Sequence, residues 1–306
     1  MKRILLTILM LTVVSTNPAF ALSNSEDAGI KRIVELTNAQ SYVKATNLFD
    51  RMIEADPSNP QLRLAGARLY RQMGMFARAM SEYKQLMNAE PHLIEPVIAL
   101  SQMYMEYLNL PQAMTLARHA VGLSPNNKTA RIALCTVLIA SDYLKEAEDE
   151  LSKLQKEAAA DPQVNYVGYK LYLKRGQLGK ARQQLEAAMK LEPGNGQWLL
   201  DLSELCEMQG DYAAANVCLQ RALHADPQSV DKLSKMATLQ EYFLHNYDQA
   251  TIQYKQILAI DPDSVTALAG LDRCKTRNND LAGMLKIQIR ALAAYLIKLF
   301  AYIQPF

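Results

Sequence analysis

Residues 210–227 read GDYAAANVCLQRALHADP, a stretch with a glycine, a run of alanines, an apolar helical pattern and a terminal Asp-Pro. It contains no evident catalytic group. Its Ala215 belongs to a series of alanines that recurs every 34 residues, with one final step of 35. The members of that series are Ala45, Ala79, Ala113, Ala147, Ala181, Ala215 and Ala250. A fixed period of this length predicts an array of repeats and not an isolated helix.

Prolines keep nearly the same period, twelve residues after the alanines: Pro57, Pro91, Pro125, Pro193, Pro227 and Pro262. Two residues after this position stands a residue of the helix-capping type in most copies: Asn59, Asn127, Asp161, Asn195, Ser229 and Ser264. Such side chains accept a hydrogen bond from a free backbone N–H in the first turn. Leu93 breaks the rule. Ala159 takes the proline position in its copy, and Pro162 begins the next helix after Asp161.

Each copy contains two helical patterns. In the copy that ends at Pro91, residues 62–72 and 76–89 are the predicted helices, and Gly74 separates them. Gly176 and Gly210 stand at the same point, where glycine can adopt left-handed backbone angles. Large residues recur eight and twenty-one positions before the proline position, on one helical face, which predicts a packed core. These residues are Phe49, Tyr83, Leu151, Leu185, Leu219 and Tyr254, and then Tyr70, Tyr104, Leu138, Tyr172 and Cys206.

This 34-residue pattern of small, aromatic and proline positions resembles the tetratricopeptide repeat family, although Trp198 lies one residue from the usual tryptophan position. The resemblance implies an all-α, right-handed superhelical solenoid of antiparallel helix pairs, mostly a binding scaffold for peptides or proteins. We expect about seven repeats over residues 22–275, with ends near 57, 91, 125, 159, 193, 227 and 262, then a partial copy. Residues 276–306 would form a capping or docking helix.

In the family, the first helices of the repeats line the concave face. Removing the core-facing positions leaves a predicted concave set: Arg68, Arg71, Gln102, Met105, Glu106, Ile132, Thr136, Ile139, Tyr166, Lys170, Leu173, Lys174, Leu200, Glu204, Glu207 and Met208. Its apolar middle and mixed charges suit an amphipathic helix or an extended peptide. The alternative is that these side chains only fill or solvate the inner surface. The carboxylate clamp of some family members is absent, since its positions carry Leu64, Arg68, Ile98, Gln102, Ile132 and Thr136.

The first 21 residues resemble a secretory signal. Lys2 and Arg3 precede an apolar run over 4–14, and Ala19-Phe20-Ala21 fits a cleavage site after Ala21. We therefore expect a periplasmic or secreted protein, with an uncleaved membrane anchor as the alternative. Leu22-Ser23-Asn24 offer no lipidated cysteine. Removing the segment takes two of the 33 basic residues and leaves 31 against 31 acidic ones, which argues against a nucleic-acid partner.

Other residues give no sign of catalysis. The cysteines Cys135, Cys206, Cys218 and Cys274 match no zinc or redox motif. Cys206 and Cys218 lie on neighbouring predicted helices, but their offset is marginal for a bridge, so small buried thiols are favoured. The histidines are scattered, and no phosphate-binding glycine loop or Gly-x-Ser-x-Gly motif occurs. We expect no enzyme activity, no cofactor and no metal.

Residues 281–303 form one long, largely apolar helical pattern with Lys286, Arg290 and Lys298 on one stripe. It is either a cap on the last repeat or a helix that docks on a membrane surface or a partner. Its charges argue against a membrane span. The expected function is an exported scaffold that binds a peptide or partner protein on its concave face, in an envelope or secretion assembly. The alternative is a membrane-associated structural component held by this helix or by an uncleaved signal.

Overall fold

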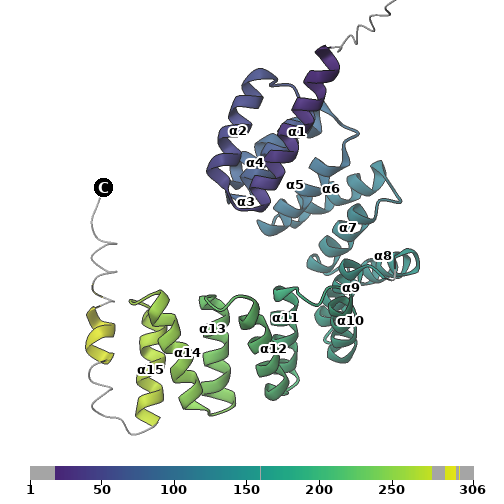
Figure 1. Cartoon of the computed structure of the whole chain (residues 1–306). Helices are drawn as coiled ribbons and strands as arrows, with labels where there is room; N and C mark the ends of the chain where they lie inside the picture. Colours follow the sequence, from purple (N-terminus) through teal and green to yellow (C-terminus); the bar gives the residue numbers. More distant parts are fainter. Residues whose placement is uncertain (1–17, 159, 278–286, 294–295, 297–306) are drawn as a thin grey trace, which may run out of the picture. The chain divides into compact units, whose positions relative to one another are not determined.

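The computed structural model describes residues 18–158, 160–277, 287–293 and 296 (Figure 1). Every secondary-structure element in these residues is helical, which confirms the all-α prediction. Most of the expected signal segment lies outside the described residues. The elements are α1 (Pro18–Asn38), α2 (Tyr42–Ala55), α3 (Pro60–Gln72), α4 (Phe76–Ala89), α5 (Ile94–Glu106), α6 (Leu110–Leu123), α7 (Lys128–Ala140), α8 (Leu144–Glu157), α9 (Pro162–Lys174), α10 (Leu178–Leu191), α11 (Gly196–Met208), α12 (Tyr212–Ala225), α13 (Val230–Thr238), η1 (Leu239–Phe243), α14 (Tyr247–Ile260) and α15 (Val265–Arg277).

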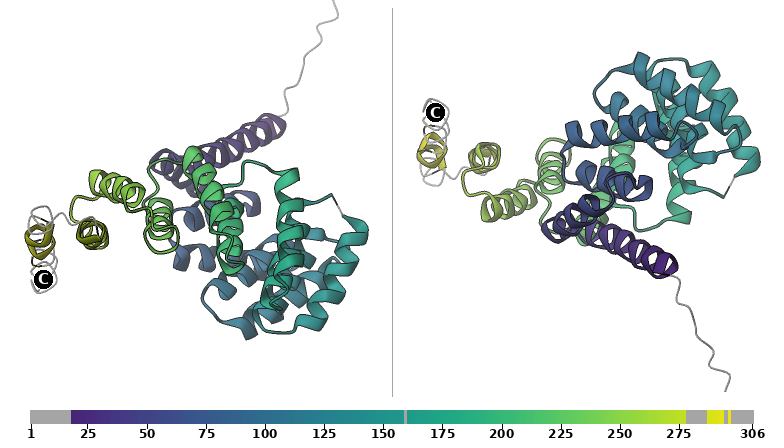
Figure 2. Two further views of the ribbon diagram at one scale, coloured as in Figure 1. Left: turned by 90° about the horizontal axis from the view of Figure 1, so that it is seen from below. Right: turned by 90° about the horizontal axis from the view of Figure 1, so that it is seen from above.

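The helices form two compact units, which divide between Tyr143 and Leu144, in the turn between α7 and α8. Within each unit every helix packs against the next one along the chain, and tight turns make the neighbours antiparallel (Figures 1 and 2). The pairs α3–α4, α5–α6, α9–α10 and α11–α12 each correspond to one predicted repeat. The sequence pattern runs through the division without a break, so it does not predict two units.

Side-chain caps begin the first helices of most repeats, as predicted. The Asn59 side chain accepts from the backbone N–H groups of Gln61 and Leu62, and Asn127 accepts from Ala130. Asp161, Asn195 and Ser229 cap α9, α11 and α13 in the same way. Leu93 has no side-chain cap, as its type requires. These local hydrogen bonds explain why the repeat boundaries can be located from sequence.

The turn inside each repeat needs one residue with left-handed backbone angles. Gly74, Gly176 and Gly210 supply it with φ of +74°, +69° and +75°. The other repeats use residues with a Cβ: Gln40, Leu108, Asp142 and His245. Leu108 has φ +58° and an 83% exposed side chain. A bulky residue is disfavoured in this conformation. Because the Leu108 side chain is exposed, no burial of apolar surface offsets this cost.

The periodic alanines lie in the core of the repeats. All seven members of the series, from Ala45 to Ala250, are fully buried. The large residues eight positions before the proline position are also buried, and Phe49 packs directly over Gly66 of α3. A Cβ at residue 66 would lie 2.3 Å from Cε2 of Phe49. Small residues on one helix thus make room for large ones on the next, at close-packed density.

The second series of large residues is less buried than predicted. Leu138 and Cys206 are in the core, but Tyr70, Tyr104 and Tyr172 are only half-buried. A basic side chain lies over each of these rings: Arg78 over Tyr70, Lys84 over Tyr104 and Lys180 over Tyr172. A tyrosine can therefore pack its ring edge inward and present a face to a cation at the surface.

The one repeat with 35 residues accommodates its extra residue in a helix. The last turn of the first helix widens from α13 into the π-helical η1. A single inserted residue in an α-helix produces this kind of turn. It places Glu241 in a fully buried position, where other repeats have a tyrosine, a leucine or a cysteine. Tyr254 donates a 2.7 Å hydrogen bond to Glu241, and Arg273 donates two more at 2.7 and 2.9 Å.

The four cysteines are buried, and in the described part of the chain none of them forms a disulfide. Burial raises the pKa of Cys218 to about 11 and also raises that of Cys206. Both thiols are therefore protonated near neutral pH, and they pack as small apolar groups. No helix among the described residues is long and apolar enough to cross a membrane.

Candidate functional site

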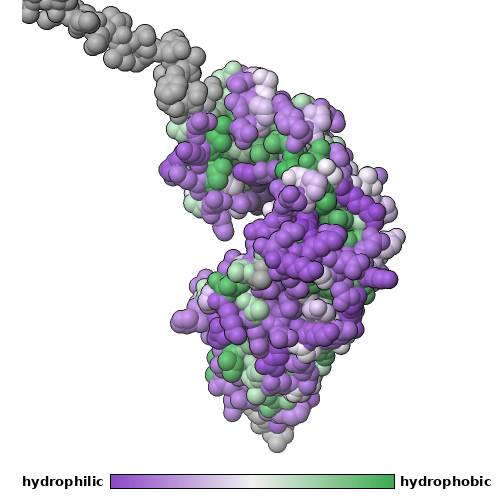
Figure 3. Space-filling view, turned by 90° about the vertical axis from the view of Figure 1, so that its right-hand side faces the viewer, coloured by the Kyte–Doolittle hydropathy of each residue, from purple (hydrophilic) through white to green (hydrophobic). Residues whose placement is uncertain are grey.

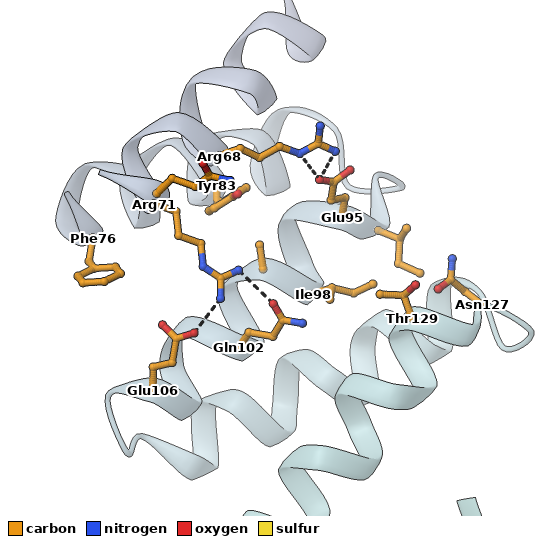
Figure 4. A pocket seen from close by; sticks show the side chains of 13 residues that line it. Arg68, Arg71, Phe76, Tyr83, Glu95, Ile98, Gln102, Glu106, Asn127 and Thr129 are labelled. Carbon is orange, nitrogen blue, oxygen red and sulfur yellow. Dashed lines mark hydrogen bonds and ion pairs between the residues drawn. The ribbon is translucent and has the colours of Figure 1, made fainter. Parts of the chain in front are cut away.

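The first unit contains a pocket of about 820 Å³ on its first helices (Figure 4). Helices α3, α5 and α7 of three consecutive repeats supply most of the lining, and α4 adds two aromatic side chains. The lining residues are Arg68, Arg71, Gln72, Phe76, Tyr83, Ile94, Glu95, Ile98, Ala99, Gln102, Glu106, Asn127 and Thr129. Arg68, Arg71, Gln102 and Glu106 were predicted for the concave face, so the repeat period brings them together.

Two arginines of α3 reach across to α5 and pair with acidic and amide groups. Arg71 donates from Nη1 to Oε1 of Gln102 at 3.0 Å and from Nη2 to Oε1 of Glu106 at 2.7 Å (Figure 4). Arg68 donates from Nε to Oε1 of Glu95 at 2.6 Å. The pocket wall therefore holds two cations and two carboxylates, which balance each other. A charged ligand must therefore compete with these internal pairs.

The floor of the pocket is apolar. Ile98, Ala99 and Tyr83 are almost fully buried beneath the ion pairs. Burial raises the pKa of Tyr83, so its phenol stays neutral. The pocket can thus accept an apolar side chain on its floor while polar groups along the wall contact the rest of a bound segment. Apolar floors with a few placed polar groups are typical of binding sites in proteins.

The remaining predicted residues of the first unit lie outside this pocket. Met105 and Ile132 are half-buried and do not line it. Thr136 donates from Oγ1 to the carbonyl oxygen of Ile132 at 2.8 Å, so its hydroxyl is satisfied within α7. Ile139 is only 6% exposed and does not line this pocket, so its role in a binding groove stays a prediction. Helix α7 is apolar on several sides, and its pattern alone does not separate core positions from groove positions.

The predicted residues of the second unit surround a buried carboxylate. Tyr166 donates from its hydroxyl to Oδ2 of Asp201 at 2.7 Å, and Gln197 donates from Nε2 to Oδ1 at 3.0 Å. The Tyr166 ring stacks on Trp198, and Nζ of Lys170 lies 4.6 Å from the centroid of the same ring. Burial lowers the pKa of Lys170, and it raises that of Tyr166 together with the Asp201 hydrogen bond. The cluster fixes the Tyr166 ring in place.

Other predicted residues of this unit are placed around the cluster. Leu173 and Leu200 are partly buried and pack against the core below it. Glu204 forms an ion pair with Lys235 of the next first helix. Burial raises the pKa of Glu207, which accepts a hydrogen bond from Ser203. Lys174 and Met208 are exposed. The second unit therefore offers a polar surface, whereas the pocket that we describe belongs to the first unit.

Several residues of these sites were not in the predicted set. Glu95 and Thr129 line the pocket, and Asp201 organises the cluster of the second unit. A sequence signal was present for Asp201, because it is the first of two acidic residues in the otherwise mostly apolar stretch WLLDLSELC. Glu95 stands in the first turn of α5, one repeat after Pro60–Gln72, so the repeat register could have placed it opposite Arg68.

The sequence model for the tetratricopeptide repeat matches residues 36–102, 105–167 and 172–238. This chain belongs to the tetratricopeptide repeat family. Proteins of this family generally mediate protein–protein interactions. The confirmed family accounts for the two helices per repeat, for the buried alanine series and for the pocket on consecutive first helices.

Individual relatives share the repeats and little more. The chain is 26% identical to mouse Superkiller complex protein 3 over 77% of its own length, and 25% identical to human Protein O-mannosyl-transferase TMTC1 over 69%. It spans only 16% and 24% of those proteins. Among solved structures, a tetratricopeptide repeat protein from Parabacteroides merdae has a TM-score of 0.58 at 13% identity, with 82% of this chain and 99% of that one covered. The human IFIT1 dimer with m7Gppp-AAAA has a TM-score of 0.64 at 15% identity, with 83% and 68% covered. At such low sequence identities, the similarity to these structures shows a shared fold and nothing more.

Proposed function

We propose that this protein is an exported, non-enzymatic scaffold whose first unit binds a segment of a partner protein in the pocket between α3, α5 and α7. One observation carries the proposal: side chains from three consecutive repeats line a single cavity with an apolar floor and a charged wall. A cavity of about 820 Å³ falls in the range typical of ligand sites. Solenoids generally use such surfaces, shared between repeats, for binding.

The pocket favours a segment with an apolar side chain flanked by polar or charged ones. Ile98 and Ala99 would contact the apolar side chain on the floor. The arginines already have carboxylate partners, so a ligand must compete with Glu95 and Glu106 for them. This competition disfavours a purely acidic ligand, because each new ion pair would cost an existing one. An amphipathic helix or an extended peptide fits these requirements.

The cellular setting is part of the proposal. The basic start, apolar run and Ala-x-Ala pattern of residues 1–21 support export to the periplasm or beyond, with an uncleaved anchor as the alternative. An envelope or secretion assembly is the setting that suits an exported scaffold. The mature chain has balanced charge, so we propose no nucleic-acid partner.

A matched pair of threonine variants tests the pocket. Thr129 is exposed at the pocket on α7, and Thr115 is exposed on α6 away from it. Thr129→Trp should fill the pocket, while Thr115→Trp makes the same change elsewhere. Affinity purification from the native host, with mass spectrometry, should recover the same partner with wild type and Thr115→Trp and lose it with Thr129→Trp. Equal recovery by both variants would refute binding at this pocket.

A further inference from the structure

The described part of the C-terminal helix, residues 287–293, is held against the last repeat (Figure 1). Ile287 is only 8% exposed and packs in one cluster with Leu268 and Leu271 of α15. Gln288 donates from Nε2 to Oδ2 of Asp272 at 3.2 Å, and Arg290 donates from Nη2 to the carbonyl oxygen of Pro262 at 3.0 Å. One face of this segment therefore packs on the last repeat.

The opposite face exposes large aliphatic side chains. Ile289, Leu292 and Leu296 are 64%, 61% and 41% exposed. Their spacing of three and four residues places them on one side of a helix. The face of the molecule seen in Figure 3 is mainly hydrophilic, with separate hydrophobic patches. A cap that served solubility alone would have a polar outer face. The exposed aliphatic stripe therefore indicates a docking surface that is buried against another partner.

Charge identifies what covers it. Residues 281–306 contain Lys286, Arg290 and Lys298 and no aspartate or glutamate, although the chain has 31 acidic residues. A second copy of this segment would bring the same net positive charge close to the first, and like charges repel each other. An anionic lipid surface offers negative headgroups and an apolar layer beneath them. An aliphatic face combined with basic residues elsewhere on the helix is the usual composition of helices that lie in this interface.

We propose that the C-terminal helix docks on the surface of anionic phospholipid membranes through Ile289, Leu292 and Leu296. The contacts of Ile287 with α15 keep the stripe pointing away from the last repeat. The scaffold would then be held at a membrane by its C-terminal end while the pocket of the first unit remains a separate site. This inference does not depend on the proposed partner-binding function, because no residue is shared between the two surfaces.

The test compares two double variants of the full chain that add the same negative charge. Ile289→Glu with Leu292→Glu changes the stripe. Val217→Glu with Ile252→Glu changes side chains of similar exposure, 53% and 45%, on α12 and α14. Both proteins keep residues 1–21, so any lipid binding by that segment is common to both. Circular dichroism confirms that each variant keeps its helical content.

Binding is measured by co-sedimentation with vesicles of phosphatidylglycerol and phosphatidylcholine, and with vesicles of phosphatidylcholine alone. Wild type and the control variant should bind the anionic vesicles, and the stripe variant should bind about tenfold more weakly or less, because two aliphatic side chains no longer enter the apolar layer. Added salt should weaken the wild-type binding. Equal binding by both variants, or no preference for anionic vesicles, would overturn the proposal. A lipid-free dimer that only the stripe variant dissociates would also overturn it, because a second copy would then cover the stripe.

Discussion

Arg71 of α3 donates a 2.7 Å hydrogen bond to Glu106 of α5 and so links two consecutive repeats in the wall of the pocket (Figure 4). The two side chains are 29% and 47% exposed. Water can therefore solvate both partners when the pair opens. This exposure suits a pair that a ligand can separate, and it does not suit a pair that holds the repeats together.

A double-mutant cycle distinguishes these roles. Arg71→Ala, Glu106→Ala and the double variant should give a coupling energy below about 1 kcal/mol in urea unfolding, because exposed ion pairs contribute little to stability. Partner recovery should nevertheless change in both single variants, since each leaves an unbalanced charge in the pocket wall. A coupling energy of about 3 kcal/mol would instead make the pair a structural one.

Unlike the exposed pair of Arg71 and Glu106, the buried Glu241 holds the structure together. Burial alone would raise its pKa, but the hydrogen bonds from Arg273 and Tyr254 outweigh this effect and hold the pKa below its usual range. Glu241→Gln should lower the free energy of unfolding by about 2 kcal/mol at neutral pH, because charge-assisted hydrogen bonds in a buried site are lost. Glu204→Gln removes a comparable but exposed ion pair with Lys235, and it should cost less than about 1 kcal/mol.

The stability difference between wild type and Glu241→Gln should also depend on pH. The pKa of Glu241 is lower in the folded chain than in the unfolded chain, so its stabilising contribution is present above the unfolded pKa of about 4.3. It is lost as the pH falls through the lower folded value. Wild type should therefore lose stability faster than Glu241→Gln as the pH falls below about 4.5, measured by urea unfolding at each pH. A constant difference between the two proteins over this range would contradict the proposed charge state.

Leu108 should be replaceable with a gain in stability. It has left-handed backbone angles and an exposed side chain, at a turn where three repeats use glycine. Asparagine tolerates this conformation, so Leu108→Asn should raise the free energy of unfolding by about 0.5 to 1 kcal/mol. Gly74→Leu makes the reverse change in the preceding repeat and should lower it by a similar or larger amount. A loss of stability in Leu108→Asn would contradict this prediction and would show that the leucine side chain makes stabilising contacts.

Much of the fold was predictable because its signals are local. A capping side chain bonds to the turn beside it, so Asn59 and Asn127 mark helix starts from their type and position alone. The buried alanine series could also be predicted, because each alanine stands at the same position of its repeat and faces the equivalent neighbouring helix. The position of Gly74 and Gly210 between two helical patterns likewise predicted that they lie in turns. These features need no knowledge of distant residues.

The candidate site was predictable only in part. The register placed Arg68, Arg71 and Gln102 on one face, but it did not identify their partners, because side-chain pairing depends on how neighbouring repeats approach. It also placed the buried Ile139 in the concave set, since an isoleucine in a broadly apolar helix fits either a core or a groove. Counting twenty-one residues back from Pro262 would have reached Glu241 and revealed a carboxylate at a core position.

A pair of glycine substitutions tests the packing between repeats. Gly66→Ala places a Cβ 2.3 Å from Phe49, so overpacking should lower the free energy of unfolding by about 1 to 3 kcal/mol. Gly122→Ala changes a helical glycine with no neighbour within 4 Å and should be neutral or stabilising by up to about 1 kcal/mol. Thermal unfolding of the two variants gives the comparison. Equal effects would show that the helices are not closely packed at residue 66.

The most direct test of the binding site is photo-crosslinking inside the native host, with a benzoylphenylalanine at position 129 or at position 115. Thr129 lies at the pocket, and Thr115 is exposed on the neighbouring second helix. A partner segment in the pocket predicts one discrete adduct from position 129 that Arg71→Ala weakens, and none from position 115. Mass spectrometry should map the adduct to a peptide with an apolar residue between polar ones. Adducts of equal yield from both positions, or from position 115 alone, would contradict a binding site on the first helices of this unit.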